Sequence, residues 1–144
     1  MFGKIEHLGI AVANLEEAEA RFTALLGVAP YKREEVASEG VITSFFMAGV
    51  NKIELLQGTH PDSPISKFIE KRGEGIHHTA FHVDDIHAEM QRLKAEGFVL
   101  IHEEPKRGAD QKLICFLHPK TTQGALIELC QDLPEGFLTC PPFF

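Results

Sequence analysis

The segment IEHLGIAV at residues 5–12 decides the fold, because its pattern returns as IHHTAFHV at residues 76–83. Both segments alternate larger apolar side chains with polar or small ones, as half-buried β-strands do. Each is followed by a polar turn and then by an amphipathic stretch that ends at a glycine, Gly27 in the first copy and Gly97 in the second. The pattern predicts two copies of one structural unit.

Helix signals follow each of the two repeated strands. Asn14, and Asp84 or Asp85 at the matching place, are suitable N-caps, because their side-chain oxygens can accept a hydrogen bond from the first helical turn. Gly27 and Gly97 can take the left-handed conformation with which many helices end. We therefore expect one helix in each copy, directly after the repeated strand.

The ends of the two halves repeat as well, since KIELL at residues 52–56 matches LIELC at residues 126–130. Further strand-like runs precede these segments, at residues 41–48 and 113–117. The predicted unit is therefore strand, helix, strand, strand, strand. A linker with a short helix, capped by Ser63 and beginning at a proline, joins the two copies.

Side-chain parity in these strands indicates a site, because residues two apart in a strand share a face. The larger apolar residues take the side suited to helix packing, and His77 shares that side. This leaves His7, His78, Glu54 and Glu128 on the opposite, concave side. Two His and two Glu at equivalent places suit a divalent ion such as zinc, cobalt, manganese or nickel. For any one histidine taken alone, a hydrogen-bonded or half-exposed side chain is the alternative.

Composition limits the class of protein. The chain has 144 residues, 44% of them hydrophobic, which is enough for one domain with a core. A formal charge of −7 without a basic run argues against nucleic acid as a partner. Three cysteines without CxxC spacing indicate free thiols. Because no apolar stretch is long enough for a membrane helix or a signal peptide, we expect a cytoplasmic protein without a membrane partner.

These motifs resemble the vicinal oxygen chelate (glyoxalase/bleomycin resistance/dioxygenase) superfamily, and within it the methylmalonyl-CoA epimerases, over roughly residues 4–133. Besides the paired strands, the motifs that carry the resemblance are DSPI at 62–65, GEGIHH at 73–78, VDDI at 83–86, EEP at 103–105, FLHPK at 116–120 and LIEL at 126–129.

The resemblance implies an α+β, glyoxalase-like fold, in which paired βαβββ modules form an open, cup-shaped mixed sheet. We expect one such domain at residues 1–133, with modules at about 4–57 and 75–131 joined by the linker. A C-terminal arm is expected at 134–144. The resemblance also implies a homodimer.

The implied activity is epimerisation of methylmalonyl-CoA at C2, by removal of the α-proton through a metal-stabilised thioester enolate. Carried over position by position, His7, His78 and Glu128 fall on the family's metal positions, and Glu54 falls on the fourth. One divalent metal ion per subunit is expected. Glu128 is the first choice for the catalytic base and Glu54 the second.

An acidic protein must meet the phosphates of an acyl-CoA with local cations. The positions that we expect to contact the substrate are Lys106, Arg107, Lys112, His118 and Lys120, although a solvated surface charge explains each cation equally well and a turn-stabilising hydrogen bond explains His118.

The chain departs from the family at two places. Some members carry a second catalytic carboxylate on the strand after the glycine that corresponds to Gly40, whereas this chain has VITS at residues 41–44. Glu54 or a metal-bound water is then the expected substitute. Where relatives commonly have GAHGK, this chain has GADQK at residues 108–112, so contact of this loop with the ligand is expected to differ.

Three other functions use the same scaffold. A lactoylglutathione lyase of the glyoxalase I type also moves a proton beside a bound metal. An extradiol dioxygenase needs two His and one carboxylate around iron(II). A non-catalytic protein of this scaffold binds a small molecule in the cup. The linker and His-Pro-Lys motifs favour the epimerase over the lyase.

Overall fold

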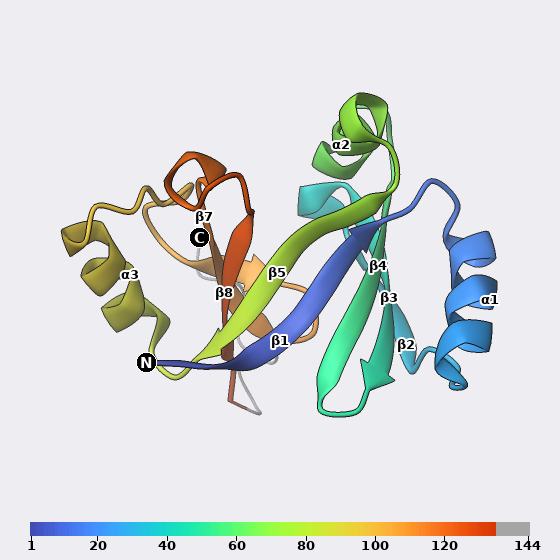
Figure 1. Cartoon of the computed structure of the whole chain (residues 1–144), viewed down its shortest axis with the longest axis horizontal. Helices are drawn as coiled ribbons and strands as arrows, with labels where there is room; N and C mark the ends of the chain where they lie inside the picture. The colour runs from blue at the N-terminus through green and yellow to red at the C-terminus, as the bar shows by residue number, and fades with distance from the viewer. Residues whose placement is uncertain (135–144) are drawn as a thin grey trace.

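The computed structural model describes residues 1–134, which form one curved mixed sheet with helices around it (Figure 1). The strands are β1 (Phe2–Ala11), β2 (Lys32–Val36), β3 (Val41–Ala48), β4 (Asn51–Gly58), β5 (Gly75–Val83), β6 (Lys106–Gly108), β7 (Lys112–Leu117) and β8 (Ile127–Asp132). The helices are α1 (Leu15–Leu26), α2 (Pro64–Arg72) and α3 (Ile86–Ala95), with 3-10 turns η1 (Ala37–Glu39) and η2 (Pro119–Thr121).

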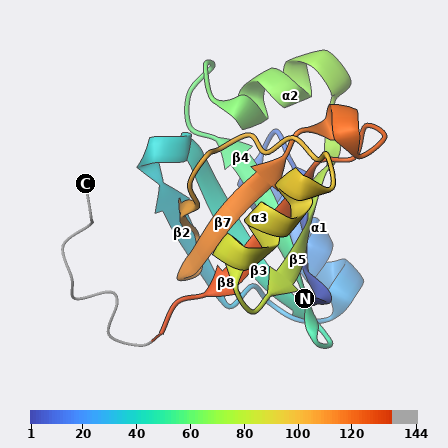
Figure 2. The ribbon, with the colours of Figure 1, turned by 90° about the vertical axis from the view of Figure 1, so that its left-hand side faces the viewer.

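The sheet has the strand order β2-β3-β4-β1-β5-β8-β7-β6, so each half repeats the other about its centre. β1 pairs parallel with β4, β5 pairs parallel with β8, and β1 and β5 join the halves antiparallel. Each half has the chain order strand, helix and three strands, which confirms the predicted fold class. Figure 2, viewed from the side of α3, shows how the sheet curves, with α2 lying across one end.

The helices begin where their capping residues predict. The side chain of Asn14 accepts a hydrogen bond from the amide of Glu17 at 3.0 Å, and Asp85 accepts one from Ala88 at 3.1 Å. Gly27 ends α1 in the left-handed conformation, with φ of 72°. Caps of this kind satisfy amides that have no partner inside the helix. In the linker, Ser63 and Pro64 begin α2 as expected.

Two apolar cores pack the outer side of the sheet against the helices, one in each half. Under α1 the buried residues are Val12, Leu15, Phe46 and Leu55. Under α3 they are Val83, Ile86, Met90, Leu93, Cys115, Leu117 and Leu129. Because the larger apolar side chains of the strands face the helices, the polar side chains of the same strands face the concave side.

Strands β2 and β6 are the outermost strands of the sheet and are the least apolar of the eight. Their sequences, KREEV and KRG, carry little of the alternation that marks a half-buried strand. Edge strands with charged side chains resist pairing with other chains. The expected arm at 134–144 lies outside the described residues except for Pro134. No helix in the described part of the chain is long and apolar enough to cross a membrane.

Candidate metal and active site

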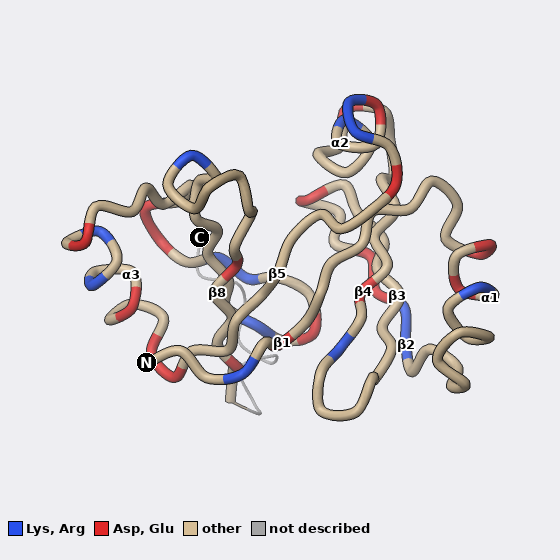
Figure 3. The backbone as a smooth tube through the Cα atoms, viewed as in Figure 1, with Lys and Arg blue, Asp and Glu red and all other residues tan. Residues whose placement is uncertain are grey.

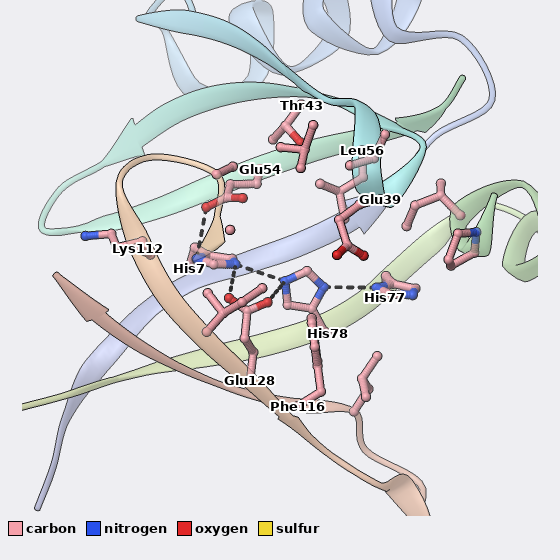
Figure 4. Close-up of a pocket in the computed structure, with 18 of the residues that line it drawn as sticks. His7, Glu39, Thr43, Glu54, Leu56, His77, His78, Lys112, Phe116 and Glu128 are labelled. Carbon is pink, nitrogen blue, oxygen red and sulfur yellow. Dashed lines mark hydrogen bonds and ion pairs between the residues drawn. The ribbon is translucent and has the colours of Figure 1, made fainter. Parts of the chain in front are cut away.

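Two rows of residues across the four central strands build the site. In one row, Gly9 of β1 lies between Glu54 of β4 and His78 of β5. In the other row, Ala80 of β5 lies between His7 of β1 and Glu128 of β8. The middle position of each row holds a small residue, so the side chains on its two sides have room to meet over it. The sequence repeat and the sheet order together bring all four predicted ligands to one place. Figure 4 shows their side chains pointing toward one another.

Four potential ligand atoms from three residues converge in this cluster. His7 Nε2 lies 2.9 Å from His78 Nε2 and 3.8 Å from Glu128 Oε1, and His78 Nε2 lies 3.2 Å from Glu128 Oε2. Glu54 Oε2 contacts the other ring nitrogen of His7, Nδ1, at 2.9 Å. All four residues are buried, each no more than 6% exposed.

The cluster fits a divalent ion. Ligand atoms about 2.1 Å from a tetrahedral ion lie roughly 3.4 Å from one another, and the three distances between the His and Glu128 atoms span that value. Nitrogen and carboxylate donors are the ligands that zinc and similar metals accept. Glu54 lies on the far side of the His7 ring in this arrangement. It is therefore placed either to orient His7 or to become a ligand if that ring turns.

Gly9 leaves space for one of the ligands. A Cβ atom at this position would lie 2.2 Å from His78 Cε1 and 2.5 Å from Nδ1, which is closer than any real contact of this kind. The ring of His78 therefore lies directly over the backbone of β1. Only glycine allows the histidine to take this position next to His7.

Burial and neighbouring charges set unequal pKa values in the cluster. Burial opposes the charge of His7, but the hydrogen bond and charge of Glu54 outweigh it and raise the pKa of His7 to about 10. Burial, together with the charge of His7, holds the pKa of His78 well below its ordinary value. Burial raises the pKa of Glu128 to about 7. The thiol of Cys130 donates a hydrogen bond to Glu128 Oε1 at 2.7 Å.

A cavity of about 310 Å³ opens above the cluster, and we call it the reaction cavity. His7, His78, Glu54 and Glu128 lie among its walls, beside apolar side chains such as Phe116. Its volume is at the lower end of the range for small-molecule sites. It therefore suits a small polar group on which the buried carboxylates and histidines can act.

The predicted substrate-binding residues are divided between the cavity and the outer surface. Lys106 and Lys112 line the reaction cavity, where Lys106 pairs with Glu39 and Lys112 with Asp132. The remaining three, Arg107, His118 and Lys120, are exposed and do not line this cavity. His118 Nδ1 accepts a hydrogen bond from the amide of Lys120 at 3.1 Å, which stabilises the turn η2.

Register shifts in the β1–β5 pairing bring two further residues to the site. The pairing omits Glu6 on β1 and His77 on β5, each directly before a site histidine. Glu6 is buried, 3.4 Å from His7 Nδ1 and 3.2 Å from the amine of Lys52. His77 lines the reaction cavity and contacts His78 Nδ1 through its own Nδ1 at 2.9 Å. Side-chain parity predicted that His77 faces the helix side. This prediction is wrong, because a register shift changes which face a strand residue occupies.

Glu39 is a third carboxylate in the reaction cavity that the sequence did not indicate. It ends the 3-10 turn η1, directly before Gly40, whose φ of 62° is in the left-handed region. Figure 4 shows its carboxylate on the side of the cavity toward His77 and His78. The strand that follows has no carboxylate, as expected, and its Thr43 is buried. A carboxylate thus reaches this wall from the preceding turn rather than from the strand.

The loop before β7, where GADQK at residues 108–112 departs from the family, joins the two halves. Asp110, with φ of 58°, forms ion pairs with Lys32 and Lys52, each at 2.7 Å, and accepts a hydrogen bond from the hydroxyl of Tyr31 at 3.2 Å. These partners all belong to the first half. Asp110 therefore holds the second half against the first at this side of the cup.

Comparisons with known proteins agree with this architecture. Residues 6–116 match the model of the glyoxalase/bleomycin resistance protein/dioxygenase superfamily. The chain belongs to this superfamily. It is 42% identical to an ethylmalonyl-CoA/methylmalonyl-CoA epimerase of Cereibacter sphaeroides, over 91% of this chain and 99% of the relative.

Solved structures of epimerases resemble the whole sheet. The methylmalonyl-CoA epimerase of Mycobacterium tuberculosis superposes with a TM-score of 0.87 at 34% identity, covering 91% of this chain and 89% of that one. A methylmalonyl-CoA epimerase in complex with methylmalonyl-CoA and NH4+ superposes with a TM-score of 0.86 at 31% identity, covering 92% and 96%.

Proposed function

We propose that this protein is a methylmalonyl-CoA epimerase, which inverts C2 of the acyl group by removing and returning the α-proton. The buried cluster of His7, His78, Glu54 and Glu128 on the floor of the reaction cavity carries the proposal. Relatives named as epimerases match nearly the whole chain, and one solved relative has methylmalonyl-CoA in its complex. The same comparisons support an acyl-CoA as the partner.

One divalent ion per subunit belongs to this proposal, held by His7, His78 and Glu128. Glu54 is its fourth ligand or holds His7 through Nδ1. These residues would hold an ion that would supply Lewis-acid stabilisation of negative charge on the thioester oxygen, worth several kcal/mol. All four residues of the cluster are themselves buried.

Glu128 is the proposed base on one face of C2. Its carboxylate lies in the cavity at the convergence of the two halves, and the Cys130 thiol fixes one of its oxygens. The acidic proton of the substrate lies between a thioester and a carboxylate, so a carboxylate base needs help only with the charge that remains after proton transfer. Glu54 is the second candidate for this role, since its Oε2 contacts His7 Nδ1 on the far side of the His7 ring from the cluster.

Inversion requires a second proton-transfer group on the opposite face. Among the described residues, three carboxylates line the reaction cavity, those of Glu39, Glu54 and Glu128. Glu39 lies outside the His and Glu cluster and comes from the first half, whereas Glu128 comes from the second. Its ion pair with Lys106 of the second half orients its carboxylate. We therefore favour Glu39 over Glu54 as the second group.

A homodimer and a cytoplasmic location complete the proposal. Ile76 of β5 is 63% exposed and pairs with Ile10 of β1, so exposed apolar surface lies where the two halves meet. A second subunit would cover such a surface. Light scattering of the purified protein measures the expected doubled mass.

The test of the function is proton NMR of methylmalonyl-CoA in D2O. We expect the C2 proton to disappear with metal-loaded protein much faster than with protein stripped of metal by a chelator. Exchange in both samples at the uncatalysed rate would contradict the proposal. Turnover of a hemithioacetal of glutathione, measured in parallel, would instead indicate the lyase.

A further inference from the structure

A second cavity, of about 370 Å³, lies next to the reaction cavity. We call it the basic cavity. One wall is the outer part of α2, another is the start of β5, and the third is the segment between η2 and β8. It shares His77, His78 and Leu126 with the reaction cavity, so these side chains separate two adjoining spaces.

The basic cavity carries only positive or neutral groups. Lys67, Lys71 and Arg72 line it from α2, and no Asp or Glu is among the described residues that line it. Figure 3 shows these basic positions together on α2 at the top of the view. Arg72 lies over the ring of Phe68, with 5.9 Å from its guanidinium carbon to the ring centroid. This contact positions the guanidinium along the cavity wall.

Lys67 and Lys71 take part in no ion pair within residues 1–134. They are four residues apart on one helix, where like charges repel and destabilise the helix. The favourable charge at the end of the helix dipole explains Lys71 and Arg72 but not Lys67, which lies in the first half of α2. The two lysines of the reaction cavity, by contrast, are already paired with carboxylates.

We propose that the basic cavity binds the phosphate groups of the acyl-CoA substrate while its acyl group occupies the reaction cavity. The proposal rests on the proposed function for its choice of ligand. Coenzyme A carries several phosphate charges, and a protein with a net charge of −7 attracts them only through a local group of cations. A guanidinium and two ammonium groups on a cavity wall whose described lining residues include no carboxylate form such a group. The two cavities adjoin at His77, His78 and Leu126, and the proposal places one extended molecule across this border.

The test compares two substrates that differ only in the phosphates. Lys67→Glu, Lys71→Glu and Arg72→Glu are made in the full chain, and kinetics are measured with methylmalonyl-CoA and with methylmalonyl-pantetheine. For the CoA ester we expect KM to rise about tenfold or more, because each variant loses a charge-assisted contact, and kcat to change less than twofold. For the pantetheine thioester both constants should stay at the wild-type values, which also shows that the variants are folded.

Lys94→Glu is the matched control, because Lys94 is also an exposed lysine in the last turn of a helix but lines neither cavity. It changes the total charge equally and should leave KM near the wild-type value. Equal KM changes in Lys94→Glu and Lys71→Glu, or equal changes for both substrates, would overturn the proposal. Calorimetric titration with coenzyme A itself separates this result from the proposed function. Even if neither the variants nor the wild-type protein turn over the ester, weaker coenzyme A binding in Lys71→Glu than in Lys94→Glu still supports the basic cavity. Undiminished binding in Lys71→Glu rejects it.

Discussion

The two halves of the molecule give the site the same backbone and different charges. In each half, a register shift turns two consecutive side chains of the central strand toward the cup. In the first half these are Glu6 and His7, and in the second half they are His77 and His78. One site histidine therefore has a carboxylate beside it, and the other has a second imidazole.

The difference separates the roles of residues that the repeat makes equivalent. Carboxylates surround His7, and the hydrogen bond of Glu54 raises its pKa to about 10 against the effect of burial. Burial and the charge of His7 lower the pKa of His78. Glu54 is engaged by a histidine at 2.9 Å, while Glu128 has a thiol partner and faces two histidine nitrogens. A repeated fold thus supplies symmetric positions, and neighbouring residues make them chemically unequal.

The largest effect is expected from Glu128→Gln compared with Glu54→Gln. Loss of the proposed base should lower kcat by roughly 10³-fold, within the usual range for a general base. Glu54→Gln, the equivalent change in the first half, should lower kcat about tenfold, as expected for a group that orients a metal ligand. Proton exchange at C2 in D2O measures both.

Metal content, measured on the same samples, is the control for this pair of variants. Glu128→Gln removes a proposed ligand as well as a base, so its activity is compared at saturating metal. Equal losses of activity in the two variants at equal metal content would mean that the halves share the chemistry equally.

The carboxylates of Glu39 and Glu128, one from each half, allow a second comparison. Glu39→Gln should lower epimerisation about 10²-fold or more, because one face of C2 loses its proton donor. Exchange of the C2 proton by Glu128, starting from the stereoisomer that faces it, should continue at a rate close to that of the wild type. NMR with each stereoisomer in D2O measures exchange, and a coupled assay specific for one stereoisomer measures inversion. Parallel loss of exchange and inversion from both stereoisomers would contradict this assignment.

Local sequence signals were sufficient for the repeated unit and for the four central residues of the cluster, whereas the joining of two units into one cup-shaped sheet was implied by the resemblance to the family. The strand alternation, the caps at Asn14 and Asp85 and the Glu-bearing ends of both halves follow from short-range rules. The repeat then placed His7 and His78 in equivalent positions of one sheet. For these residues the side-chain parity of a regular strand was enough.

Parity fails where the pairing of two distant strands shifts its register. Glu6 and His77 face the site because the β1–β5 pairing shifts its register where they lie, and nothing within either strand indicates this. Glu39 reaches the cavity from a 3-10 turn, which has no two-residue periodicity. The predicted contact of GADQK with the ligand depends in the same way on distant partners, because Asp110 pairs with lysines of the first half.

An intermediate effect is expected from replacing Gly9 and Ala80, the small residues in the middle of the two rows that build the site. Gly9→Ala should displace His78, because the added methyl group meets its ring at 2.2 Å, and should weaken metal binding by about 10-fold to 100-fold. The equivalent change in the second half, Ala80→Gly, should leave metal binding intact and lower the free energy of unfolding by about 1 kcal/mol, the usual cost of glycine in a strand. Cobalt(II) titration and urea denaturation measure the two quantities. Unchanged cobalt affinity in Gly9→Ala would show that His78 is not a ligand or that its ring can move.

The smallest effect is expected from the residues beside the two histidines, where the halves differ most in charge. Glu6→Gln removes the carboxylate 3.4 Å from His7 Nδ1, while Lys52 keeps its ion pair with Asp110 at 2.7 Å. Lys52 then has one carboxylate partner instead of two, which leaves more positive charge near His7. Affinity for cobalt(II) should therefore fall by roughly tenfold, as it does when a group that hydrogen-bonds to a metal ligand is removed. His77→Gln replaces a neutral ring by a neutral amide, since burial lowers the pKa of His77 to about 4, and should change the affinity less than threefold. Equal changes in the two variants would show that the charge beside each histidine does not distinguish the halves, and the inequality would then have to come from Glu54 and Glu128 themselves.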